Sequence, residues 1–172
     1  MDNEECKGLA TILHGTSLKW ERKVATSTLW TMLPQERGLY MFVWCPELMF
    51  CCENRLDTSA TDIEYFRWIL YVGKAGVEDG KSDTLKDRYK NGYAKYVGND
   101  PSLLWKSQPG ENTKRDALLS RYLTLRPLEF WYLTLEDTYD ILTLEKKLIK
   151  TLNPPLNKQH GKRLIPGKPE PA

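Results

Sequence analysis

Two segments of this chain carry nearly uninterrupted runs of apolar, β-forming residues, and they restrict the fold more than any other feature. One run covers residues 38–45 and the other covers residues 65–73. Such continuous apolarity is typical of strands in the middle of a sheet. The polar residues between the runs predict that the two strands form a hairpin with an enlarged loop. A third strand is expected over residues 128–135, where apolar and polar residues partly alternate.

Three helices are predicted from capping residues and apolar spacing. Thr84 followed by Asp87 fits a capping box for the first helix, which is expected to pass Gly92 and to continue. Its apolar face would hold Leu85, Tyr89, Tyr93 and Tyr96. The second helix covers residues 114–125, and the third begins near Asp137 and Asp140 and ends at residues 153–155. This order predicts an α+β fold with a small, mostly antiparallel, three-stranded sheet flanked by helices.

Length and composition predict one domain with additions at both ends. The 172 residues, 41% of them hydrophobic, are enough for one packed core. We expect a helical N-terminal extension over residues 1–33, the principal domain over 34–157, and a basic, proline-containing tail over 158–172. The apolar runs are too short for a membrane span, and the four cysteines lack the spacing of a zinc site. A cytoplasmic protein with free thiols and no membrane partner is therefore expected.

The net charge of +2 does not by itself indicate a nucleic-acid-binding protein, but the charge is unevenly distributed. Residues 145–172 contain seven Lys and Arg against two Glu, which gives +5 there and −3 for the rest of the chain. More basic residues lie around the first helix. These groups are either a solvated surface or contacts for phosphates. The candidates for phosphate contacts are Lys86, Lys90, Lys95 and Lys158.

Glu145 is the most informative single residue. Its helical neighbours three and four positions away are all apolar, namely Ile141, Leu142, Leu148 and Ile149. A carboxylate within such a stripe is unfavourable unless a cation or hydrogen bonds compensate it. Glu145 is therefore either half of a structural salt bridge or a metal-binding or catalytic carboxylate that faces a cleft. The sequence of this helix alone does not choose between the two.

The order of short motifs along the chain resembles the GIY-YIG nuclease superfamily. Gly-Leu-Tyr stands at residues 38–40 and Tyr-Val-Gly at residues 71–73, each in a predicted strand. Arg88 follows in a helix, and Glu145 lies in a later helix, twelve residues ahead of Asn157. Each tripeptide is common by itself, whereas the ordered set is much more specific and spans most of the chain.

This resemblance implies which residues carry the chemistry. The matched positions are Tyr40, Tyr71, Lys74, Arg88, Glu145 and Asn157. In that family the glutamate binds one divalent cation, Mg²⁺ or Mn²⁺, and a tyrosine orients or deprotonates the attacking water. The residue types suit this role, because a carboxylate is a hard oxygen ligand and a guanidinium binds two phosphate oxygens. Which tyrosine acts as the base stays open.

Two features depart from the usual family pattern. Residues 41–70 separate the two motif tyrosines, a longer connection than in compact members, which resembles the restriction-endonuclease branch. Many members also carry a His or Tyr four residues after the helix arginine, where this chain has Gly92. Tyr93 is the nearest substitute and is therefore a candidate auxiliary residue.

We therefore expect a metal-dependent DNA endonuclease of the restriction or defence type. RNA is an alternative substrate, and a homodimer or larger complex is a natural way to cut both strands. The alternative from another class is a nucleic-acid-binding subunit with weak or no catalytic activity, which Gly92 and the modest net charge favour. A third is a partner-binding domain unrelated to nucleic acid, since strand tyrosines such as Tyr40 and Tyr71 are more often packing residues.

Overall fold

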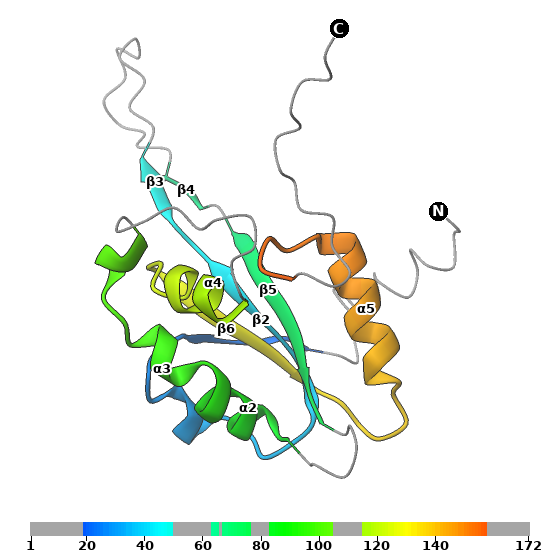
Figure 1. The fold of residues 1–172 in the computed structure, drawn as a ribbon. Helices are drawn as coiled ribbons and strands as arrows, with labels where there is room; N and C mark the ends of the chain where they lie inside the picture. The colour runs from blue at the N-terminus through cyan, green and yellow to red at the C-terminus, as the bar shows by residue number, and fades with distance from the viewer. Residues whose placement is uncertain (1–18, 50–62, 66, 77–82, 105–114, 158–172) are drawn as a thin grey trace, which may run out of the picture.

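A four-stranded antiparallel sheet lies at the centre of the protein (Figure 1). The computed structural model describes residues 19–49, 63–65, 67–76, 83–104 and 115–157. The strands of the sheet follow the order β1-β6-β2-β5. They are β1 (Glu21–Val24), β2 (Gly38–Trp44), β5 (Trp68–Ala75) and β6 (Leu128–Thr134). The predicted α+β class is confirmed, with one more strand than expected.

The two continuous apolar runs form neighbouring strands, as the sequence predicts. β2 pairs antiparallel with β5 on one side and with β6 on the other. A short two-stranded sheet of β3 (Glu47–Met49) and β4 (Ile63–Tyr65) extends this hairpin beyond the main sheet (Figure 1). The tip of the connection, residues 50–62, lies outside the described residues.

The fourth strand comes from the segment that we expected to be a helical extension. Residues 21–24 form β1, which pairs with β6, and the only helical turn described before β2 is the 3₁₀-helix η1 (Leu29–Met32). The prediction of helix over residues 21–24 and of only three strands was therefore wrong. Three of the four β1 side chains are exposed, so this edge strand has no alternating apolar pattern that the sequence could reveal. Residues 1–18 lie outside the described part of the chain.

Helices cover both faces of the sheet (Figure 1). On one face, α2 (Leu85–Gly92), α3 (Ala94–Val97), α4 (Arg115–Tyr122) and η1 pack against an aromatic layer. On the other face, α5 (Ile141–Leu152) packs against an aliphatic layer. A second 3₁₀-helix, η2 (Pro101–Leu104), follows α3. We call the two sides the aromatic face, which includes Tyr40, Phe42 and Phe130, and the aliphatic face, which includes Leu39, Met41 and Val43.

The helix ends follow the predicted capping residues, with one correction. Thr84 and Asp87 form the expected capping box of α2, and Asp140 caps α5 through the amide of Thr143. The first helix, however, does not continue through Tyr93. It ends at Gly92, because the backbone of Tyr93 (φ −130°) leaves the helical region, and α3 begins afresh at Ala94.

The outer edge of β5 is covered by the segment that follows α5. Asn153 ends the helix in a left-handed conformation (φ 44°), which turns the chain back toward the sheet. The amide of Leu156 then donates to the carbonyl of Leu70 (3.1 Å), and Asn157 binds the backbone of Val72. This segment forms hydrogen bonds with backbone groups of β5 that would otherwise be unpaired at the edge of the sheet.

Two expectations concern the chain more widely. Among the described helices, none combines the length and the apolarity that crossing a membrane requires. Of the four cysteines, Cys45 lies within the described residues, where it is a free thiol.

Gly38 and Gly92 provide a matched pair of substitutions that tests the packing of β2. A Cβ at Gly38 would lie 2.1 Å from the backbone oxygen of Leu133, which is fixed in β6. We expect Gly38→Ala to lower the free energy of unfolding by about 3 kcal/mol or more, because the strands must move apart. At Gly92 nothing lies within 4 Å of the added Cβ, and we expect Gly92→Ala to raise stability by about 0.5–1 kcal/mol. Urea denaturation measures both, and similar effects would contradict the packing described.

Candidate active site

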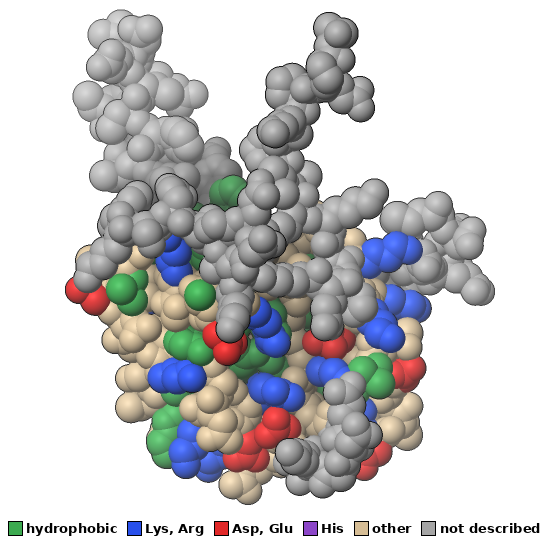
Figure 2. Space-filling view, viewed as in Figure 1, with side chains coloured by type: hydrophobic (Ala, Val, Ile, Leu, Met, Phe, Trp, Pro, Cys, Tyr) green, Lys and Arg blue, Asp and Glu red, His purple; other side chains and the backbone are tan. Residues whose placement is uncertain are grey.

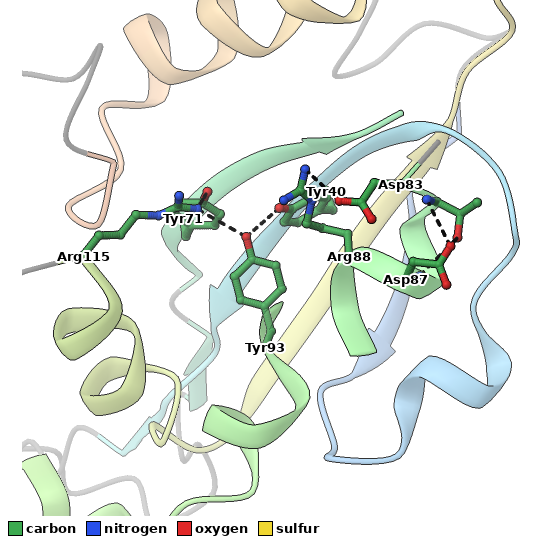
Figure 3. Close-up of polar contacts among 8 residues, drawn as sticks. Tyr40, Tyr71, Asp83, Asp87, Arg88, Tyr93 and Arg115 are labelled. Atoms are coloured by element: carbon green, nitrogen blue, oxygen red, sulfur yellow. Dashed lines mark hydrogen bonds and ion pairs between the residues drawn. The ribbon is translucent and has the colours of Figure 1, made fainter. Parts of the chain in front are cut away.

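Three tyrosines meet on the aromatic face of the sheet (Figure 3). Tyr40 comes from β2, Tyr71 from β5, and Tyr93 from the break between α2 and α3. The hydroxyl oxygens of Tyr40 and Tyr93 lie 2.6 Å apart. Tyr71 lies beside both, with ring centroids 6.3 Å from Tyr40 and 5.9 Å from Tyr93. We call these residues the tyrosine cluster; it contains both predicted motif tyrosines and the predicted auxiliary residue.

Gly73 makes room for the head of Tyr40. The two residues are direct partners across β2 and β5. A Cβ at Gly73 would lie 2.5 Å from both Cζ and the hydroxyl oxygen of Tyr40. The glycine of the second motif is therefore required by a contact with the tyrosine of the first motif, which gives the sequence pattern a steric reason.

Two arginines lie against the tyrosine cluster. Arg88, on α2, forms an ion pair with Asp83 (3.2 Å), while its Nε is buried without a hydrogen-bond partner in the described part of the chain. Arg115, on α4, donates through Nη2 to the hydroxyl of Tyr71. The same nitrogen lies 3.4 Å from the hydroxyl of Tyr93, and the guanidinium carbon lies 5.0 Å from the ring centroid of Tyr71.

Arg115 contacts the tyrosine cluster but is not among the residues that the sequence singles out. The helix that carries it was predicted, but only its apolar residues were used, because they define the packed face. No motif of the family marks this position, and a basic residue in the first turn of a helix gives no signal of its own. Only the fold brings α4 over Tyr71.

Burial dominates the acid–base properties of the cluster. It raises the pKa of Tyr40 well above its ordinary value, and the neighbouring Tyr93 and Tyr71 add to this, while the charge of Arg88 opposes it. Burial also raises the pKa of Tyr71, with Tyr93 adding and Arg115 opposing. Both hydroxyls are therefore protonated at neutral pH.

Glu145 lies half-buried on α5 and is not sealed within the apolar stripe. Its neighbours Ile141, Leu148 and Ile149 are buried, whereas Leu142 is 37% exposed, so the stripe is open on one side. The negative charge of Glu145 contributes to the raised pKa of Tyr71, after burial and Tyr93. The carboxylate is thus within electrostatic range of the tyrosine cluster, across the edge strand β5.

The donor set fits a divalent cation that keeps most of its own water. Within the described ranges, no three His, Cys, Asp or Glu side chains gather into a common ligand group. Mg²⁺ commonly binds proteins through one or two carboxylates and retains several water ligands. Glu145 is a half-buried carboxylate of the type that contributes to such a site.

The side chains of Lys74 and Asn157 lie outside the tyrosine cluster. Lys74 pairs with Leu39, so its side chain belongs to the aliphatic face, on the side of α5. Asn157 is buried, and its amide both accepts from the amide of Val72 (2.9 Å) and donates to the carbonyl of Val72 (2.7 Å). The asparagine therefore fixes the strand that carries Tyr71.

The basic residues expected to contact phosphates lie on the outer surface of α2 and α3. Lys90 lies over the ring of Trp30 (4.5 Å) and Lys95 over the ring of Tyr96 (4.7 Å), while Lys86 is half-buried on α2. Figure 2 shows Lys and Arg side chains together with Asp and Glu among the described residues of the face in view. Lys158 lies outside the described residues.

Comparisons with protein-family models, with curated proteins and with solved structures give no match. The resemblance to GIY-YIG nucleases therefore rests on the motif residues and on their arrangement.

The two hydrogen bonds of Asn157 predict a large effect on stability. Asn157→Ala leaves a buried amide and a buried carbonyl of Val72 without partners, and we expect it to lower the free energy of unfolding by about 2–4 kcal/mol. Asn91→Ala, at an exposed position of α2, is the matched control and should change stability by about 0.5 kcal/mol or less. Equal effects in urea denaturation would show that Asn157 does not hold β5.

The raised pKa values predict a loss of stability at alkaline pH. A buried tyrosine keeps its proton in the folded protein, whereas the unfolded chain loses it near pH ~10, so rising pH favours unfolding. We expect the stability that these two tyrosines contribute to be constant up to about pH 9.5 and to fall above it. Tyr40→Phe should reduce the slope by about 1.4 kcal/mol per pH unit, because one such proton is removed. An equal reduction in Tyr139→Phe, the exposed control, would contradict this assignment.

Proposed function

We propose that this protein is an endonuclease of the GIY-YIG type, which hydrolyses phosphodiester bonds in DNA with Mg²⁺ or Mn²⁺. The observation that carries the proposal is that Tyr40, Tyr71 and Arg88, which the order of motifs in the sequence singles out, lie together in the fold. Three residues from β2, β5 and α2 meet at one place, with the carboxylate of Glu145 in electrostatic range. If the motifs had arisen by chance, there would be no reason for their residues to lie together in the fold.

Arg88 is assigned to the phosphate. Its charge acts on Tyr40, and its buried Nε has no hydrogen-bond partner among the described residues. An unpartnered guanidinium nitrogen is unfavourable in a buried position unless a ligand completes it. A phosphate oxygen is a suitable acceptor, since guanidinium groups bind phosphates through two parallel hydrogen bonds.

Glu145 is assigned to the cation and Tyr71 to the attacking water. When bound, the cation supplies positive charge beside the phosphoryl oxygens, where negative charge develops during hydrolysis. Tyr71 is assigned the water because the charges of both Glu145 and Arg115 act on it, whereas no carboxylate of the described residues is among the main groups that shift the pKa of Tyr40. The ring of Tyr40 packs beside the ring of Tyr71 and helps to hold it in place.

A nucleic-acid-binding subunit without strong catalysis is the second candidate. It is favoured by the position of Tyr93, which replaces the usual residue four places after the arginine and uses its hydroxyl to bind Tyr40. It is also favoured by the mixture of acidic and basic side chains in Figure 2. Salt-dependent binding of DNA without cleavage in Mg²⁺ or Mn²⁺ would select this function.

Substitution of the proposed metal ligand tests the nuclease. We expect the protein to convert supercoiled DNA of mixed sequence to nicked or linear forms when Mg²⁺ is present and not when EDTA is added. Glu145→Gln should lower the rate by at least about 100-fold, because the neutral amide is a poor ligand for Mg²⁺. Glu136→Gln is the matched control, since Glu136 is exposed in the segment before α5, and it should cut at the rate of the unmodified protein.

Arg88→Lys adds a second arm to this test. It keeps the charge but loses the planar fork, and we expect a lower rate of cleavage with the fold unchanged. Cleavage by Glu145→Gln at the unmodified rate would remove the assignment of the metal ligand. Absence of cleavage in every metal tested would remove the nuclease.

A further inference from the structure

We propose that Arg115 is a positioning residue of this site, which fixes the orientation of the Tyr71 hydroxyl for the reaction. The inference rests on the proposed function and deepens it, because it adds an arginine that the motif pattern does not contain. Arg115 lies in the first turn of α4, on the opposite side of the tyrosine cluster from Arg88 (Figure 3).

The contacts of Arg115 are concentrated on the tyrosines. Its Nη2 donates to the hydroxyl of Tyr71 and lies 3.4 Å from the hydroxyl of Tyr93. Its guanidinium carbon lies 5.0 Å from the centre of the Tyr71 ring, within range of a cation–π interaction. The guanidinium thus holds Tyr71 both at the ring and at the oxygen.

A guanidinium can only donate hydrogen bonds, and this fixes the direction of the proton on Tyr71. The oxygen of Tyr71 must accept from Arg115, so its own hydrogen points away from α4. Tyr93 also accepts from Arg115, and its hydroxyl shares a hydrogen bond of 2.6 Å with the hydroxyl of Tyr40, in which either oxygen can be the donor. One arginine therefore donates to two of the three hydroxyl groups of the tyrosine cluster and fixes the direction of the Tyr71 proton.

The contacts of Arg88 and Arg115 suit different roles. The charge of Arg88 opposes the effect of burial on the pKa of Tyr40, and the charge of Arg115 opposes it on the pKa of Tyr71. Arg88 keeps a buried Nε without a hydrogen-bond partner in the described part of the chain, which suits a phosphate. Arg115 has Nη2 already directed at two hydroxyl groups, which suits positioning.

Kinetics separate positioning from phosphate binding. We expect Arg115→Met to lower kcat by about 100-fold with the affinity for DNA in EDTA unchanged, since misplacing a reacting group affects the chemical step. The pH–rate profile should move to higher pH, because the cation near the Tyr71 oxygen is lost. Arg115→Lys should recover part of kcat. Arg121→Met is the matched control: the guanidinium of Arg121, on the same helix, donates to the carbonyl of Leu104, and kcat should be unchanged.

A spectroscopic measurement tests the contact without any cleavage. In protein labelled with ¹³Cζ-tyrosine, the Tyr71 resonance is identified by its loss in Tyr71→Phe. It should shift in Arg115→Met and shift less in Arg115→Lys. The resonance of Tyr89, whose hydroxyl donates to the carbonyl of Thr26 (2.8 Å), should stay in place.

The outcomes distinguish this inference from the proposed function. An unmoved Tyr71 resonance in Arg115→Met overturns the inference even if the protein cuts DNA. Weaker DNA binding with unchanged kcat also overturns it, because Arg115 would then be a phosphate ligand. If the unmodified protein cuts no nucleic acid, the proposed function fails, and with it the role of Arg115 in the reaction, while a shifted resonance would still establish its contact with Tyr71.

Discussion

The buried hydroxyl of Tyr40 needs a hydrogen-bond partner and space, and several surrounding elements provide them. It lies in the core beneath the helices, where a hydroxyl without a partner is unfavourable by about 1–3 kcal/mol. Tyr93 supplies the partner, and the break between α2 and α3 falls at this residue. Gly73 supplies the space. One polar atom thus links β2, β5 and the helical layer, and these same elements present the residues to which we assign the chemistry.

The edge position of β5 explains how groups from both faces reach one place. Tyr71 belongs to the aromatic face and Glu145 to the helix on the aliphatic face, yet the charge of Glu145 contributes to the raised pKa of Tyr71. β5 is at the edge of the described sheet, so no further strand of this sheet lies between the two faces beyond it. Asn157, a few residues beyond α5, closes the same edge by binding Val72. The helix that carries the carboxylate is therefore tied to the strand that carries the tyrosine.

The sequence predicted those parts of the molecule whose own pattern reflects their surroundings. Strands β2, β5 and β6 and the caps Thr84 and Asp140 follow from local residue types. Strand β1 does not, since its exposed side chains say nothing about the backbone of β6 that pairs with it. The contact of Arg115 with Tyr71 could not be predicted for a similar reason, because it depends on where α4 packs. The motif residues Tyr40, Tyr71 and Arg88 do come together, while Asn157 supports the backbone.

The strand order has a consequence for how the chain folds during its synthesis. Among the described residues, β1 pairs with β6 alone. Glu21 and Tyr132, which form a side-chain hydrogen bond, are 111 residues apart. At ordinary rates of translation, the ribosome needs on the order of ten seconds to supply that much chain. During this interval the first strand emerges without its pairing partner, so a truncated nascent chain cannot complete its outermost ladder. Docking of the N-terminal strand is thereby a late event in biogenesis.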